Sequence, residues 1–145
     1  MESKHKYTVD LQWDGERKGT LTAGVSPQSI EVATGSDFHK GIEGAWSPEH
    51  LYLATLTSCL MTTFLAVAEN SNLIFSDFKC NAIATADEVD RLLQIADVII
   101  KLTVCVPSSK TVQKALRIIA ISEKHCVISN SVKTRIHIAP EVIVK

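Results

Sequence analysis

Residues 47–70 read SPEHLYLATLTSCLMTTFLAVAEN, and this stretch decides the fold. Ser47 can cap the free amide groups of a helix, Pro48 lacks the hydrogen that would go unbonded at the first position, and Glu49 suits the positive end of the dipole. The stretch therefore predicts a long helix that runs from Pro48 to about Asn70.

The 18 residues of this helix from Leu51 to Ala68 include no charged residue. That length touches the lower limit for a membrane-spanning helix. The segment contains several serine and threonine residues and is flanked by chain that alternates like half-buried strands, so we expect it at the centre of a soluble core. A helix that is apolar on nearly every side needs more cover than one small sheet provides, which indicates a homodimer in which the helix meets its copy.

The chain before the helix predicts an antiparallel meander. Residues 7–13 alternate with a strict period of two, GERKG at 15–19 makes a turn, and further strands are expected over 21–25 and 30–33. Residues 34–46 contain three glycines and no period, so they predict a long loop of the kind that is more often functional than idle.

The chain after the helix predicts two long strands, a second helix and a final strand. Residues 78–85 and 96–106 alternate around an acidic connection, ADEVDR at 86–91. A second amphipathic helix opens at residues 107–109, with an inner stripe expected at Val112, Ala115, Leu116 and Ile119, and the last strand starts near Ser131. The whole chain, 1–145, therefore predicts one α+β domain with the order βββαββαβ.

Composition and charge exclude several classes of protein. The chain has 145 residues, of which 46% are hydrophobic, so it can bury a core. The net charge of −1 gives no field for nucleic acid or an anionic membrane, and we expect neither partner. The first residues lack a secretory signal, which predicts a cytoplasmic protein with reduced thiols.

Four cysteines, at positions 59, 80, 105 and 126, carry the chemistry that the sequence offers. No two have metal-ligand spacing, so we expect no metal. Cys80 and Cys105 lie in strands and are assigned to packing, although Cys105 falls on the more polar face. Cys59, taken alone, resembles a small core residue. Cys126 follows the second helix in a turn rich in Ser and Asn, where it can approach another thiol.

Four segments resemble the osmotically induced protein C and organic hydroperoxide resistance proteins (OsmC/Ohr), which are small thiol peroxidases. These segments are GERKG at 15–19, SPE at 47–49, TSCL at 57–60 and HCVISN at 125–130. The sequence differs from the family at Val127, where members usually have Pro, and at Thr55 and Thr57, which replace small alanines. The resemblance implies an intertwined homodimer with a long central helix packed on antiparallel sheet.

The resemblance also implies that Cys59 is the peroxidatic cysteine and Cys126 the resolving one. Organic hydroperoxides would be reduced to alcohols through a Cys59 sulfenic acid and a disulfide, which a small or lipoyl-type dithiol would reduce, without a cofactor. An apolar site needs a cation to hold a thiolate, and Arg17 is the best candidate, with Glu49 fixing its guanidinium. Considered without the family, Arg17 reads as an exposed hairpin residue.

Helix geometry constrains how these residues meet. Glu49 and Cys59 are ten residues apart on one helix, which separates them by about 15 Å of rise. One chain cannot supply both to one site. We therefore expect each site to take Cys59 and Cys126 from one subunit with Arg17 and Glu49 from its partner.

Two other functions remain open at this point. The first is a non-catalytic OsmC-like protein that uses the thiols as a redox sensor or binds a small molecule. The second is an acyl-thioester-handling domain, which also wraps a sheet around a central helix. This second alternative lacks an obvious acidic residue inside the helix.

Overall fold

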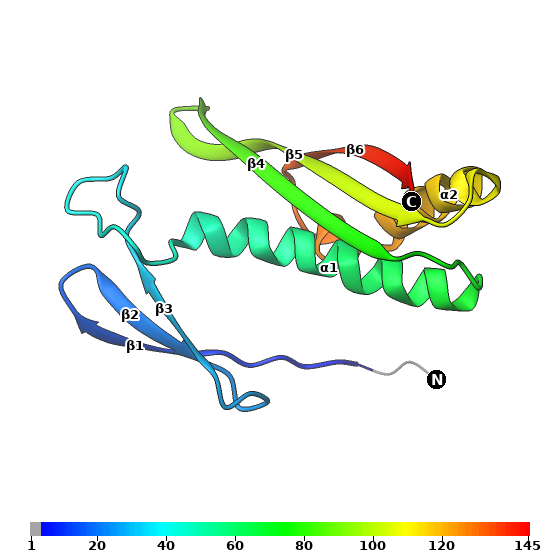
Figure 1. Ribbon diagram of the computed structural model, residues 1–145. Helices are drawn as coiled ribbons and strands as arrows, with labels where there is room; N and C mark the ends of the chain where they lie inside the picture. The colour runs from blue at the N-terminus through cyan, green and yellow to red at the C-terminus, as the bar shows by residue number, and fades with distance from the viewer. Residues whose placement is uncertain (1–3) are drawn as a thin grey trace. The chain divides into compact units, whose positions relative to one another are not determined.

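The computed structural model describes residues 4–145, and its elements follow the expected order βββαββαβ (Figure 1). The α+β class is therefore confirmed. The chain divides into two compact units, Met1–Tyr52 and Leu53–Lys145, so that the boundary falls within the first helix. Each unit is described below by itself.

The first unit contains an antiparallel sheet in the order β1-β2-β3. Its strands are β1 (Asp10–Gly15), β2 (Lys18–Thr22) and β3 (Ser29–Ala33). Strand β1 begins later than the alternation predicts, and β2 is shifted, since it starts at Lys18 within the expected turn and ends at Thr22; the register pairs Asp10 with Thr22 at the end of both strands. The β1–β2 turn places Glu16 at a positive φ of 50°.

The loop over residues 34–46 is held by backbone hydrogen bonds at both ends. The Ala33 amide donates to the Trp46 carbonyl at 2.8 Å, and the Thr34 amide donates to the Arg17 carbonyl at 3.0 Å. Gly41 packs so closely on the Gly35 backbone that a Cβ atom there would overlap the Gly35 carbonyl. The loop is thus a defined piece of structure that joins the hairpin to the start of the helix.

The long helix α1 (Pro48–Asn70) confirms the predicted element at both ends. One stripe of it is buried, at Leu56, Leu60, Phe64 and Ala68, which are spaced four residues apart as one helix face requires. The Phe64 ring packs on Phe75 and Phe78, with ring centroids 5.2 Å and 4.8 Å away. These contacts fix the helix against the second sheet.

Helix α1 also has a second, exposed apolar side. Met61 and Leu65 are exposed by 39% and 41%, respectively. By length and composition alone the helix could cross a membrane, although the core helix of a soluble protein passes the same test. An apolar side of this kind is what a helix that packs on a second copy would present.

The second unit contains a sheet in the order β4-β5-β6. Its strands are β4 (Asp77–Val89), β5 (Leu92–Val106) and β6 (Arg135–Val144). Strands β4 and β5 are antiparallel, as expected, but β6 runs parallel to β5. The reason is that the chain crosses over through a helix between these two strands, as parallel neighbours require.

The β4–β5 hairpin extends further than the sequence predicts. Its strands run through the expected connection at 86–91 and leave only Asp90 and Arg91 in the turn, with positive φ values of 51° and 67°. Such a two-residue turn with both residues left-handed matches the twist of the strands. One face of β5 is buried in the core, as its alternation predicts; the fully buried members are Val98, Ile100, Leu102, Val104 and Val106.

Helix α2 (Val112–His125) follows a short 3₁₀ turn, η1 (Ser109–Thr111), and packs against β5 and β6. Its buried residues are Ala115, Ile118, Ile119 and Ser122. The buried stripe thus includes Ser122 and leaves Val112 and Leu116 half-buried, which differs from the expected stripe. The buried Ser122 hydroxyl is satisfied because it donates to the Ile118 carbonyl at 2.7 Å.

Candidate functional site

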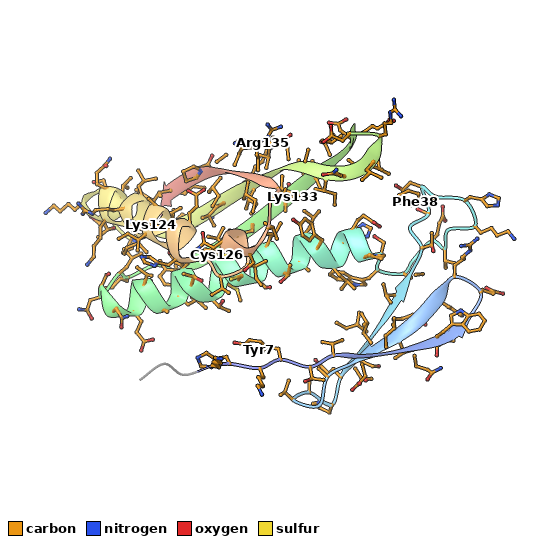
Figure 2. The ribbon with its side chains drawn as sticks, turned by 180° about the vertical axis from the view of Figure 1, so that it is seen from behind. Tyr7, Phe38, Lys124, Cys126, Lys133 and Arg135 are labelled. Carbon is orange, nitrogen blue, oxygen red and sulfur yellow. The ribbon has the colours of Figure 1, made fainter. Side chains whose placement is uncertain are left out.

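The second unit brings Cys59 and Cys126 together. Cys59 lies at the middle of α1 and is half-buried, whereas Cys126 directly follows α2 and is fully buried. Figure 2 shows Cys126 beside the middle of α1. Both are free thiols, and the Cys126 thiol donates a hydrogen bond to the Cys59 sulfur. Two segments 67 residues apart in sequence therefore meet at one pair of sulfur atoms.

The turn that carries Cys126 is held by several hydrogen bonds. The Cys126 backbone is extended, with φ −69° and ψ 114°, so the chain leaves the axis of α2 at this residue. The Asn130 amide then donates to the Cys126 carbonyl at 3.1 Å, and the Asn130 side chain donates to the Lys124 carbonyl at 3.0 Å. A second 3₁₀ turn, η2 (Ser129–Ser131), completes the connection. Cys126 is thus positioned by backbone geometry that Asn130 reinforces.

The Cys59 thiol ionises more readily than an ordinary cysteine. Its partial burial raises the pKa, but hydrogen bonds to the sulfur outweigh that cost and lower the pKa below its usual value. The donors are, in decreasing effect, the Ile128 amide, the Cys126 thiol, the Thr63 hydroxyl and the Val127 amide. Hydrogen bonding to the charged form of an acid favours that form. The surroundings of Cys59 therefore favour a thiolate, which is the nucleophilic form of cysteine.

The other two cysteines lie outside this pair. Cys80 on β4 is half-buried, and burial alone raises its pKa to about 11. Cys105 on β5 is only 5% exposed, although its place in the alternation put it on the more polar face. In the part of the chain that the structure describes, residues 4–145, no three His, Cys, Asp or Glu side chains form a group that could hold a metal ion.

Arg17 and Glu49 belong to the first unit, so their meeting with the cysteines stays a prediction. Arg17 is exposed in the β1–β2 turn and lines an open pocket of about 280 Å³ together with Trp13 and Pro48. Glu49 lies in the exposed first turn of α1. Among the ion pairs of residues 4–145, none joins these two side chains.

The N-terminus of α1 is capped as predicted, with one addition. The His50 amide donates to Ser47 Oγ at 3.2 Å. His50 also returns an interaction, because the Ser47 amide donates to His50 Nδ1 at 3.3 Å and Ser47 Oγ lies 2.6 Å from the same nitrogen. This reciprocal pattern is that of a capping box, in which a Glu or Gln usually takes the place of His50.

Three of the donors to Cys59 are not among the residues predicted from the sequence. Thr63 could have been found, because it lies four residues after Cys59 and such residues share one face of a helix. The amides of Val127 and Ile128 could not have been predicted, because every residue except proline has a backbone N–H and its direction is not visible in a sequence. They act on Cys59 only because of the way in which the chain turns after α2.

Comparison with known proteins identifies the family of the chain. The sequence profile described as OsmC-like protein matches residues 39–141, which is more than half of the chain and includes both cysteines of the pair. The chain belongs to the OsmC-like protein family. The resemblance seen in the four sequence segments is therefore confirmed. No curated protein sequence matches the chain.

Solved structures of other OsmC-like proteins share the fold. An OsmC-like protein of unknown function from Vibrio cholerae superposes with a TM-score of 0.85 at 18% identity, over 95% of this chain and 100% of that one. An organic hydroperoxide resistance protein from Elizabethkingia anophelis gives 0.74 at 16% identity, over 100% of both chains. One from Legionella pneumophila gives 0.72 at 16% identity, over 99% and 100%. At these identities the similarity establishes the OsmC-like fold.

Proposed function

We propose that this OsmC-like protein is a cysteine-based peroxidase that reduces organic hydroperoxides in defence against oxidative stress. The Cys59 thiolate attacks the terminal oxygen of the hydroperoxide, so that an S–O bond forms, the O–O bond breaks and the alkoxide takes a proton to leave as an alcohol. The Cys126 sulfur then attacks the Cys59 sulfenic acid, forming a disulfide and releasing water. A dithiol reductant returns both thiols and is itself oxidised to a disulfide.

One observation carries the proposal, namely the contact between a thiol of lowered pKa and a second free thiol. Cys59 has the donors that favour a thiolate, and Cys126 already lies within hydrogen-bonding reach of its sulfur. A nucleophile beside a resolving thiol is the arrangement that redox-active cysteines use. The half-buried position of Cys59 leaves the nucleophile accessible, whereas the partner is sealed from solvent.

Three further parts of the proposal concern the assembly, the residues that complete the site and the reductant. We expect residues 1–145 to act as one OsmC-like domain in a cytoplasmic homodimer, and the exposed apolar side of α1 at Met61 and Leu65 supports an interface there. Arg17 and Glu49 would complete each site from the partner subunit. The reductant would be a small or lipoyl-type dithiol.

Turnover of an organic hydroperoxide tests this function. With dihydrolipoamide as reductant, the protein is expected to consume cumene hydroperoxide at least about tenfold faster than hydrogen peroxide, a ratio equivalent to about 1.4 kcal/mol. The reason is that burying the organic tail stabilises the complex, whereas hydrogen peroxide has no tail. Rates are measured by loss of each peroxide. Equal rates for the two peroxides would remove tail binding from the mechanism.

Oxidation should join one pair of cysteines and leave the other pair reduced. One equivalent of cumene hydroperoxide is expected to produce an intrachain Cys59–Cys126 disulfide, because only Cys59 combines a lowered pKa with a second sulfur beside it. Cys80 should stay reduced, since its raised pKa leaves almost no thiolate at neutral pH. Peptide mapping without reduction identifies the bridge. A bridge to Cys80 or Cys105 would contradict the assignment.

The amount of hydroperoxide consumed with dihydrolipoamide present separates the peroxidase from a redox sensor. A peroxidase disulfide is reduced by dihydrolipoamide in each cycle, so hydroperoxide is consumed in large excess over protein. A sensor would form the Cys59–Cys126 disulfide once and stop at about one equivalent. Consumption that ends there with dihydrolipoamide present would therefore favour the sensor.

A further inference from the structure

Cys126 is only weakly attached to the helix that precedes it. Its backbone amide donates to the Glu123 carbonyl at 3.4 Å, which is long for such a bond, and its extended backbone turns the chain away from α2. The carbonyl groups in the last turn of a helix have no partner within the helix. The Lys124 carbonyl is one of these groups, so its donor has to come from outside α2.

One residue, Asn130, supplies hydrogen bonds on both sides of this break in the helix. Its side-chain amide donates to the Lys124 carbonyl at 3.0 Å, and its backbone amide donates to the Cys126 carbonyl at 3.1 Å. Both bonds have ordinary lengths, and together they tie the last turn of α2 and Cys126 to the same residue. Asn130 is exposed, so it holds the turn by hydrogen bonds and not by packing in the core.

We propose that the side chain of Asn130 is a positioning residue that holds Cys126 in place for closure of the disulfide with Cys59. In this step the Cys126 sulfur displaces water from the Cys59 sulfenic acid. A disulfide forms only within a narrow range of backbone separations and side-chain directions. Cys126 is fully buried, so its sulfur depends on the position of its own backbone to reach Cys59. The inference rests on the proposed peroxidase function for the origin of the sulfenic acid.

Two variants remove the side-chain donor in different ways. Asn130→Ala deletes the amide, and Asn130→Asp keeps the shape of the side chain but presents a carboxylate, which cannot donate to the Lys124 carbonyl. Without this bond the turn opens in the reduced protein, so that only a fraction of the molecules present Cys126 to Cys59. We expect closure to be about tenfold slower in both variants, a factor equivalent to about 1.4 kcal/mol and within the range of one hydrogen bond.

Ser131→Ala is the matched control. The Ser131 hydroxyl donates to the Val127 carbonyl at 2.7 Å, so this variant also removes one exposed hydrogen bond from the same turn. That bond lies after Cys126 and does not tie it to α2. We therefore expect Ser131→Ala to close the disulfide at the wild-type rate, whereas a general loosening of the turn would slow closure in all three variants.

The measurement is a competition for the Cys59 sulfenic acid. Each protein receives one equivalent of cumene hydroperoxide in the presence of dimedone, which traps a sulfenic acid, and peptide mapping gives the ratio of the Cys59 adduct to the Cys59–Cys126 disulfide. This ratio does not depend on how fast the sulfenic acid forms. It should rise about tenfold in both Asn130 variants. A ratio that stays at the wild-type value in both, or that rises equally in Ser131→Ala, would overturn the proposal.

A second measurement needs no hydroperoxide, so the two proposals can fail separately. In a glutathione redox buffer, the equilibrium between the thiol pair and its disulfide should shift about tenfold toward the thiols in the Asn130 variants, which corresponds to about 30 mV. If the wild type consumes no cumene hydroperoxide but this shift is found, the peroxidase function is wrong and the positioning role stands. If turnover is normal and neither the trapping ratio nor the equilibrium changes, the function stands and Asn130 has no such role.

Discussion

The substitution Cys59→Ser is expected to lower the rate of cumene hydroperoxide consumption at least about a thousandfold, as loss of a covalent nucleophile generally does. A serine hydroxyl at this place remains protonated at neutral pH, and its oxygen cannot be oxidised to the equivalent of a sulfenic acid. The hydrogen-bond donors around position 59 would then face a neutral hydroxyl and would have no thiolate to stabilise. The rate is measured with dihydrolipoamide in excess.

Cys80→Ala is the matched control for this variant. It also removes one half-buried thiol from the second unit. Burial raises the pKa of this Cys80 thiol to about 11, so it is not the reactive form at neutral pH. We expect it to retain the wild-type rate. A Cys59→Ser protein that still turns over, or a Cys80→Ala protein that does not, would show that the reactive thiol has been wrongly assigned.

Mixed dimers are expected to recover activity from two inactive proteins. If each site takes its cysteines from one chain and Arg17 and Glu49 from the other, Cys59→Ser and the double variant Arg17→Ala/Glu49→Ala are each inactive alone. A mixed dimer then contains one whole site. After co-refolding, half the dimers are mixed and half of their sites are whole, so roughly a quarter of the wild-type activity should return.

The measurement is the hydroperoxide rate before and after co-refolding, at equal total protein. Each variant refolded alone is the control and should stay inactive. Recovery shows that the site is shared. A mixture that stays inactive would show that each chain builds its own site, or that Arg17 and Glu49 do not activate Cys59.

Local signals made much of the fold predictable from the sequence. Ser47 and Pro48 mark a helix start through their own chemistry, and α1 begins there. The β4–β5 turn was less predictable, because the acidic residues at 86–91 resemble a surface connection. The strands continue through most of that segment since the left-handed pair Asp90 and Arg91 sets the register. The parallel placement of β6 depends on a crossover that no alternation pattern records.

The candidate site was predictable only in part, for a related reason. The pairing of Cys59 with Cys126 was implied by the resemblance, and the structure places the two sulfur atoms in contact. From the sequence, a cation, Arg17, is expected to lower the pKa of the Cys59 thiol. Within the described second unit, neutral donors already do so, and two of them are backbone amides. The chemistry of a side chain follows from the residue type, whereas the orientation of a backbone amide depends on the folded conformation of the turn.

The crossover between β5 and β6 has a consequence for the newly made protein. Cys126 and the two amides lie on the connection between α2 and β6, which is synthesised long after Cys59. Until that connection docks, Cys59 lacks these donors and is an ordinary thiol. Its reactivity therefore arises only when the second unit has folded. We therefore expect Cys59 in an incomplete chain to react with an alkylating agent like an ordinary thiol, and its reactivity to rise as the second unit folds.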